Sequence, residues 1–288
     1  MNIDEIFKDA FCTWVRHECY ECHQQDDDTW YYCPGGDAEV IPYNPVEQIR
    51  KIALDVLNMG CEFEAAGSEE ALVINRTLHF VQKYGMLGLM VDLPLNENFL
   101  ETGEVFFATN AFACAKHLDT DKYMKLFFPE DPPEAVPAIA EFTHRPPVYG
   151  YAFSTFYMEQ LVWFETYCLE KYRLLRACNE YRKTEDYTGI QQLRQVIVQG
   201  ADHKIRYNID TTDSPKIRWE FASLKAMIDL YIVGSITDAA APIRECKYCG
   251  KVFYAENARL EFCSPQCRNK YNVYKFRRKG EAEDVGEE

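Results

Sequence analysis

Residues 246 to 279 read CKYCGKVFYAENARLEFCSPQCRNKYNVYKFRRK and hold two close pairs of cysteines. The pairs are spaced as Cys246-x2-Cys249 and Cys263-x3-Cys267. Two thiolate pairs on a short spacer are the donor set of a closed, four-coordinate structural zinc site, which leaves no position for an activated water. The pattern therefore predicts one structural Zn²⁺ bound by these four cysteines.

The residues around the cysteines predict how the chain would surround the metal. Gly250 follows the second cysteine, where a turn that points its N–H groups at the sulfurs needs a residue tolerant of positive φ. Residues 252 to 254, Val-Phe-Tyr, are typical of a short strand. Ser264 and Pro265 suit the N-cap and first position of a helix that would carry Cys267 on its first turn. A knuckle, a hairpin and a ligand-bearing helix in this order predict a treble-clef-like zinc finger.

Over these residues the chain resembles the CGNR-type zinc finger, which ends a group of bacterial proteins assigned to transcription regulation. The match covers residues 246 to 279 and, less closely, a helix expected over about 222 to 233. The resemblance implies four cysteine ligands, a treble-clef-like fold and binding to DNA. Residues 267 to 270 read Cys-Arg-Asn-Lys where the family has Cys-Gly-Asn-Arg, a departure that leaves the metal ligand in place.

The segment around the cysteines is basic, whereas the rest of the chain is acidic. Residues 244 to 279 hold ten Lys or Arg against three Glu, a net charge of +7, while residues 1 to 243 carry −17 and residues 280 to 288 carry −5. Affinity for nucleic acid depends on the local potential, within a Debye length of about 8 Å at physiological salt. The overall net charge of −15 therefore does not exclude nucleic-acid binding.

The last predicted helix has two faces. Cys267, Tyr271 and Tyr274 recur at helical spacing and are expected to face the metal. The candidate nucleic-acid contacts are Arg268, Asn269, Lys270, Lys275, Arg277, Arg278 and Lys279. The first two lie nearest the helix N-terminus and suit base edges, whereas the other cations suit phosphates. The alternative is a basic face that only keeps a small domain soluble.

The remaining chain predicts a mainly helical body with a small sheet. Hydrophobic residues make up 47% of the sequence, enough for a packed core. Helical spacing predicts helices over residues 44 to 60, 68 to 85, 151 to 181 and 222 to 233. Gly60 and Gly85 are expected to end the first two helices, Ser68 to cap the second, and the aromatic stripe of the third to be core. Period-two alternation predicts an antiparallel meander near residues 196 to 198, 205 to 209 and 217 to 221.

These elements predict an α+β fold, mainly α with a small antiparallel meander, that ends in a treble-clef-like zinc finger. The expected domains are an acidic helical body over residues 1 to 240, a finger with a basic helix over 241 to 279, and a disordered acidic tail over 280 to 288. Five prolines between residues 130 and 150 predict an irregular crossing inside the body. The acidic tail could fold back on the basic helix and weaken nonspecific binding.

A second cluster of metal-binding residue types lies near the N-terminus. It consists of Cys12, His17, Cys19, Cys22, His23 and Cys33. Although Cys19 and Cys22 have knuckle spacing, no glycine follows Cys22 and no matching second pair is found, so a second zinc is not expected. The preferred interpretation is a helix followed by a polar loop at Asp26 to Asp28.

The sequence leaves three classes of function open. No G-x-S-x-G, P-loop, G-x-G-x-x-G or H-E-x-x-H motif is found, so an enzyme is not expected, although catalytic groups can assemble from distant residues. A DNA-binding transcription regulator, whose body senses a signal or dimerises, comes first. A protein-interaction module with a purely structural zinc comes second, and an enzyme whose finger recruits substrate comes third.

The expected location is the cytoplasm, without membrane association. The N-terminal residues MNIDEIFKDAF lack a basic stretch followed by an apolar one, and no run of 18 apolar residues is present. In that compartment the 12 cysteines are expected to be thiols or thiolates rather than disulfides.

Overall fold

The computed structural model describes residues 3–89, 157–185, 206–238 and 242–284 apart from positions 9, 13, 212, 213, 222 and 258, together with 104–106, 117–119 and 129. Within these residues, helices predominate and the strands form small, mainly antiparallel sheets, which confirms the α+β class. The predicted crossing at 130–150 and the first strand of the meander, at 196–198, lie outside the described residues.

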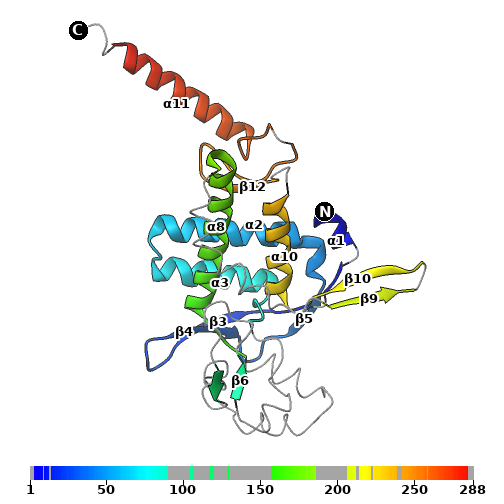
Figure 1. Ribbon diagram of the computed structural model, residues 1–288. Helices are drawn as coiled ribbons and strands as arrows, with labels where there is room; N and C mark the ends of the chain where they lie inside the picture. The colour runs from blue at the N-terminus through cyan, green and yellow to red at the C-terminus, as the bar shows by residue number, and fades with distance from the viewer. Residues whose placement is uncertain are drawn as a thin grey trace.

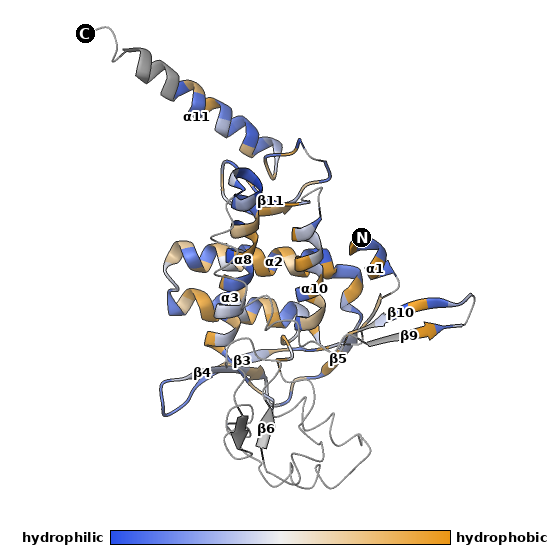
Figure 2. Cartoon of the chain, viewed as in Figure 1, coloured by the Kyte–Doolittle hydropathy of each residue, from blue (hydrophilic) through white to orange (hydrophobic). Residues whose placement is uncertain are grey.

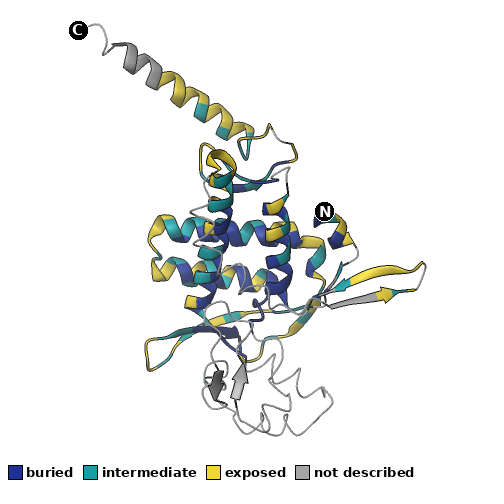
Figure 3. Ribbon diagram, in the orientation of Figure 1, coloured by how far each residue is buried: buried dark blue, intermediate teal, exposed yellow. Residues whose placement is uncertain are grey.

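Four helices build the core of the body (Figure 1). They are α2 (Ile49–Ala66), α3 (Glu70–Tyr84), α8 (Leu161–Thr184) and α10 (Leu224–Thr237). The consecutive helices α2 and α3 pack on each other, and both α8 and α10 cross α2. The short helix α1 (Ile3–Lys8) lies against α10, and the 3₁₀ turn η1 (Pro45–Gln48) leads into α2. The buried apolar faces of these helices form one continuous core, drawn dark blue in Figure 3.

The end predicted for the first helix, at Gly60, is wrong. α2 runs through Gly60 to Ala66 and ends at Gly67, whose φ of 68° is the left-handed conformation of a glycine C-cap. At Gly60, a Cβ atom would lie 2.2 Å from the carbonyl oxygen of Cys168 on α8. Gly60 is therefore a contact point where α8 approaches the α2 backbone, and a glycine inside a helix can serve packing as well as termination.

Two further helix boundaries differ from those predicted. Ser68 is not a cap but belongs to the end of α2, since its N–H donates to the carbonyl of Phe63. The long third helix starts at Leu161 rather than near residue 151, because the two residues before it pair with a strand as β8 (Glu159–Gln160). Gly85 ends α3 as expected, and the apolar stripe of α8 is buried as expected.

Most of the strands form small sheets around one end of the helical core (Figure 1). The N-terminal strands are β1 (Ala10–Phe11), β2 (Trp14–His17), β3 (Tyr20–Gln24), β4 (Trp30–Pro34) and β5 (Val40–Tyr43). The later ones are β6 (Glu104–Phe106), β7 (His117–Asp119), β9 (Arg206–Asp210) and β10 (Lys216–Glu220). β2 pairs with β5, β3 with β4, and β4 with β8, all antiparallel. The pair β6 and β7 forms a two-stranded sheet. β9 and β10 form the predicted hairpin, and β10 also pairs in parallel with β1.

Four residues of the N-terminal cluster, His17, Cys22, His23 and Cys33, lie on strands, and Cys12 and Cys19 lie between strands, so the helix preferred for the cluster is wrong. The polar loop at Asp26 to Asp28 is the turn between β3 and β4. Antiparallel pairing places Cys22 opposite Tyr32 and Cys33 opposite Glu21. Cys22 lies in β3, whereas Cys19 precedes that strand and is exposed, with its sulfur beside Gly35. Among the described residues, neither thiol belongs to a group of three or more side chains whose ligand atoms are near enough to share a metal ion.

A buried carboxylate, Glu159, joins the strands to the end of α3. It accepts hydrogen bonds from the hydroxyls of Tyr32 and Tyr157 and from the backbone N–H groups of residues 87 to 89. Burial raises the pKa of Glu159, and these donors act in the opposite direction. With donors on both oxygens, this carboxylate holds β4, β8 and the segment after α3 in one arrangement.

A second buried polar cluster lies between α8 and α10. The carboxylate of Asp229 is 2.7 Å from the ammonium nitrogens of both Lys171 and Lys225, and it accepts from the hydroxyl of Tyr167 at 2.9 Å. Burial lowers the pKa of Lys225, whose side chain is only 2% exposed. Asp229 therefore compensates two ammonium groups that would otherwise be costly to bury.

Within the described part of the chain, no helix combines the length and the apolar composition that a membrane crossing requires.

Candidate metal centre and basic helix

The four cysteines of the C-terminal segment converge in space. Their sulfur atoms all lie within 4.8 Å of one another. Three separations are 3.6 Å between Cys249 and Cys263, 3.5 Å between Cys263 and Cys267, and 3.8 Å between Cys267 and Cys249. A metal with bonds of about 2.3 Å to sulfur places tetrahedral ligands about 3.8 Å apart, whereas a disulfide needs about 2.0 Å. These sulfurs are close enough to bind one metal ion.

No other such group occurs in the described ranges. Among those residues, the four cysteines form the one set of three or more His, Cys, Asp or Glu side chains whose ligand atoms are near enough to share an ion. Cys246 is buried, Cys249 is exposed, and the other two are half-buried. The cysteine cluster thus lies at the protein surface, and only Cys246 is buried.

A hairpin and a tight turn position the first pair. β11 (Ile243–Glu245) pairs with β12 (Val252–Tyr254), and the cysteine turn connects them. The N–H of Cys246 donates to the carbonyl of Lys251, and the N–H of Gly250 donates back to the carbonyl of Cys246. Gly250 has a φ of 73°, as the sequence predicted, and a Cβ there would meet nothing within 4 Å. The glycine is needed for its backbone conformation, not for space.

Backbone donors favour the thiolate form of Cys246. Burial by itself raises the pKa of this thiol. The backbone N–H groups of Tyr248, Cys249 and Cys263 donate to the sulfur and lower the pKa. The resulting pKa is about 6. Burial and the neighbouring thiols raise the pKa of Cys263 to about 12. Crowded thiols resist further ionisation unless a cation compensates their charge, so this donor set fits a metal.

The second pair lies at the start of α11 (Pro265–Asp284). The hydroxyl of Ser264 accepts from the N–H of Cys267 at 3.2 Å, so the predicted N-cap and the predicted place of Cys267 on the first turn are both confirmed. The ring of Phe262 lies 5.2 Å from that of Tyr271 and covers the inner side of this turn. α11 continues to Asp284, so the first residues of the tail expected to be disordered are helical, and residues 285–288 lie outside the description.

The hairpin half of the segment is built into the body. The side chain of Asn58 on α2 accepts from the N–H of Val252 at 2.8 Å and donates to its carbonyl at 3.0 Å, as a neighbouring strand would. The hydroxyl of Tyr172 on α8 donates to Glu245 at 2.7 Å. Ile243 and Val252 are each 1% exposed and belong to the main core.

A cation–π contact adds to this attachment. The guanidinium of Arg50 lies 3.9 Å from the ring centre of Tyr254, and both side chains contact the carboxylate of Asp4. β11 and β12 are therefore part of the body's packing, although the sequence predicted a separate finger from residue 241. The signals for this attachment are distant in sequence, which is why spacing alone could not identify Asn58 or Tyr172.

Outside the cysteine cluster, the second half of the segment, from residue 259 through α11, is attached to the first half by few contacts, and those described involve residues 260 and 261. The N–H and the ammonium of Lys247 both bond to Glu261, and Arg244 donates to the carbonyl of Leu260 at 3.4 Å. Beyond these contacts, α11 extends away from the body (Figure 1). A metal held by all four cysteines would therefore connect α11 to a hairpin that is already anchored.

α11 is exposed and mostly polar along its described side chains (Figures 2 and 3). The exposed candidate contacts are Arg268, Asn269, Lys270, Lys275 and Arg277. Those of Arg278 and Lys279 lie outside the described side chains. Tyr271 is half-buried near the metal centre as expected, but Tyr274 is 60% exposed, so its predicted place in the small core is wrong.

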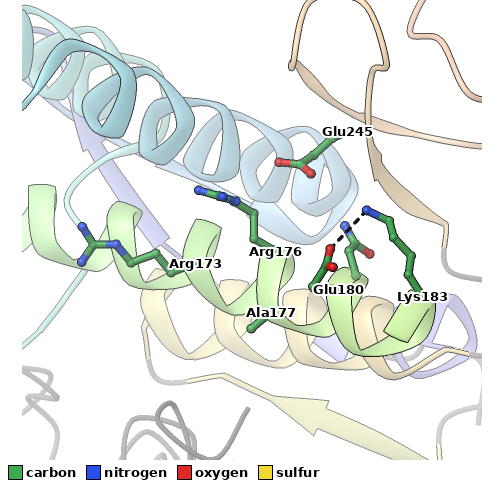
Figure 4. A pocket seen from close by; sticks show the side chains of 7 residues that line it. Arg173, Arg176, Ala177, Glu180, Lys183 and Glu245 are labelled. Carbon is green, nitrogen blue, oxygen red and sulfur yellow. Dashed lines mark ion pairs between the residues drawn. The ribbon is translucent and has the colours of Figure 1, made fainter. Parts of the chain in front are cut away.

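A surface hollow of about 410 Å³ lies where α8 meets β11 (Figure 4). Its lining residues are Arg173, Arg176, Ala177, Asn179, Glu180, Lys183 and Glu245. Glu64 accepts from both arginines, and Lys183 pairs with Glu180 at 3.5 Å. The lining holds three cations against two carboxylates, and the charge is balanced by Glu64 beside it. Because the lining includes no Ser, His or Cys, we assign the hollow no ligand.

No protein-family model, curated protein or solved structure gives a significant match to this chain.

Proposed function

We propose that the chain is a zinc-stabilised DNA-binding protein whose contact element is α11. The four-thiolate donor set, with separations close to tetrahedral edges, supports Zn²⁺ as the ion, because zinc accepts this geometry without redox chemistry. The order of knuckle, hairpin and ligand-bearing helix supports a treble-clef-like finger of the CGNR type. A metal analysis of purified protein tests the ion directly, and one zinc per chain is the expected result.

The observation that carries the DNA proposal is the surface of α11. From Phe262 to Gly280 the sequence contains no acidic residue, and the described cations of this stretch are exposed on a helix that leaves the body. An α-helix with side chains is about 10–12 Å across and fits the major groove of B-DNA. Phosphate contacts by such cations release counterions and make affinity dependent on salt.

The anchored hairpin supports a division of roles within the protein. Zinc would set the direction of α11 relative to β11 and β12, and the body would hold this hairpin in place. In this proposal the body serves regulation, as a sensor or dimerisation unit, and transcription control in the cytoplasm is the broader role.

Fluorescence anisotropy of the zinc-loaded full chain with a random pool of duplex DNA tests the proposal. We expect nonspecific dissociation constants of roughly 10⁻⁶ to 10⁻⁴ M and a steep loss of affinity with salt. Changing Lys275→Glu and Arg277→Glu, two exposed cations far from the ligands, should weaken binding and flatten the slope of log K against log salt by roughly 1.8.

The matched control changes Lys51→Glu and Lys183→Glu, two exposed cations of the body, and alters the net charge equally. Equal binding by both double variants, or no binding by the unchanged chain near 10⁻⁴ M, would overturn the DNA proposal. The second outcome, together with recovery of a protein partner that needs the zinc-loaded segment, would favour the interaction module. The charge-balanced hollow gives no support to an enzyme.

A further inference from the structure

The face of α11 opposite the metal differs from its flanks. On an ideal helix of 3.6 residues per turn, positions 269, 272, 273 and 276 fall within about 100° of one another, on the side away from Cys267. This strip is formed by Asn269, Asn272, Val273 and Phe276. All four side chains are exposed, Val273 by 53% and Phe276 by 81%. Such exposure is costly for a phenyl ring unless a partner covers it.

Cations border the strip on both sides. Lys270 and Arg277 lie about 100° to one side of its centre, and Arg268 and Lys275 lie about 100° to the other. A protein groove that covered the strip would need two acidic rims, whereas the major groove has a phosphate backbone along each edge. The charge arrangement therefore selects duplex DNA as the partner of this face.

The strip also has the chemistry of base recognition. An Asn side chain can make paired hydrogen bonds to N6 and N7 of adenine, and an apolar side chain can contact the methyl group of thymine. The distance along the axis from Asn269 to Phe276 is about 10 Å, or about three base pairs. RNA is a poorer fit, because the major groove of an A-form duplex is narrow and uracil lacks the methyl group.

We propose that α11 enters the major groove with this strip against the bases and prefers A·T-containing sites. The inference rests on the proposed DNA-binding function and goes beyond it by naming the reading face and the preferred base pairs. It assigns Arg268, expected from the sequence to reach base edges, to a phosphate backbone instead.

The test compares zinc-loaded full chain on three duplexes: alternating poly(dA-dT), the same polymer with deoxyuridine in place of thymine, and alternating poly(dG-dC). Each thymine methyl contacted should be worth about fourfold in affinity, since burial of one such group contributes about 0.8 kcal/mol. We expect the order dA-dT, then dA-dU, then dG-dC. Val273→Ala with Phe276→Ala should abolish the difference between thymine and deoxyuridine while leaving salt-dependent binding.

Tyr274→Ala is the matched control, because Tyr274 is an exposed aromatic residue, 60% against 81% for Phe276, on the same helix but outside the strip. It should retain the thymine preference. Equal affinity for the three duplexes, or tighter binding to single-stranded than to duplex DNA, would overturn the inference and leave the proposed function standing. Failure to bind any nucleic acid would instead overturn both.

Discussion

Asn58 is one of the side chains that join the cysteine-bearing segment to the body. Its amide takes the place of a third strand beside β12, with both hydrogen bonds made to one residue, Val252. Val252 itself is in the core, so water cannot readily replace a lost partner. A substitution of Asn58 should therefore weaken the attachment of the β11–β12 hairpin without changing any of the four cysteines.

We expect Asn58→Ala to lower the free energy of unfolding by about 2 kcal/mol, because it leaves a buried N–H and a buried carbonyl unpaired. Urea denaturation of the zinc-loaded chain measures this. Asn58→Asp, which retains the acceptor but loses the donor, should lie between. Lys51→Ala, at an exposed position on the same helix, is the control. A loss no larger than that of the control would mean that Asn58 does not anchor the hairpin.

Asp229 is a second position where one side chain has a large structural role. Asp229→Asn would remove the carboxylate that pairs with both Lys171 and Lys225 and leave only the charge of Glu170 near them, and we expect a loss of about 3 kcal/mol or more. Lys225→Met should be far milder, because it removes one of the two charges and retains apolar volume. Thermal or urea unfolding of the two variants provides the comparison. If both variants lost the same free energy of unfolding, the uncompensated buried charge would not be the cause of the loss in Asp229→Asn.

The pH dependence of the same variant has a definite sign. Burial holds the pKa of Lys225 below its ordinary value of 10.5, and removal of Asp229 lowers it further. The folded Asp229→Asn variant then binds fewer protons than its unfolded chain. Its free energy of unfolding should therefore rise with pH until about pH 10.5, and a flat or falling profile would contradict this assignment.

Among the elements, α11 and the β11–β12 hairpin should respond differently to metal loss. The sequence alone suggests that residues 244 to 279 would unfold together. The structure places the hairpin in the core and gives α11 few other attachments, so we expect only the later part to depend on a bound metal. Isolated helices of this length are marginal in water, and α11 contains no strong apolar face of its own.

We expect Cys267→Ser, or chelation of the metal, to release residues 259 to 284 while 243 to 254 stay protected. Hydrogen exchange measured by mass spectrometry should show fast exchange in the first range alone. Cys19→Ser, an exposed cysteine of the body, should change neither range. Loss of protection in 243 to 254 as well would mean that the whole segment folds as one metal-dependent unit, as the sequence suggests.

In the molecule as a whole, charge of opposite sign is separated along the chain. The body carries −17 and the segment of residues 244 to 279 carries +7, and five carboxylates follow within residues 280 to 288. Because α11 extends away from the body, its cations are exposed to solvent rather than neutralised by the acidic surface. Three of those five acidic residues, Glu281, Glu283 and Asp284, belong to the last turn of α11 itself.

Removal of residues 281 to 288 should therefore tighten DNA binding severalfold at low salt. The tail begins within about 6 Å along the helix axis of Arg277, inside the Debye length. The gain should disappear as salt is raised, and anisotropy titrations of the two chains over a salt series test both statements. Equal affinities at low salt would show that the tail does not compete for the basic helix.

Local spacing was enough to predict the ligand set and most helices. A cysteine pair, an N-cap and an apolar stripe each depend on residues within a few positions of one another. The convergence of the four cysteines, the N-cap at Ser264 and the buried side of α8 were therefore predicted correctly. The boundary errors arose where contacts between distant segments prevailed. Gly60 continues its helix because α8 approaches it, and residues 159 and 160 form a strand because β4 lies beside them.

The sequence thus specified which residues gather around a metal and which helix carries the positive charge, because both are written in short-range order and composition. Packing determined that the hairpin belongs to the body and the helix does not. Asn58 and Val252 are 194 positions apart, and no periodicity links them. The attachment of the hairpin from which α11 extends follows from that long-range contact, since a contact between distant segments forms only when the core assembles.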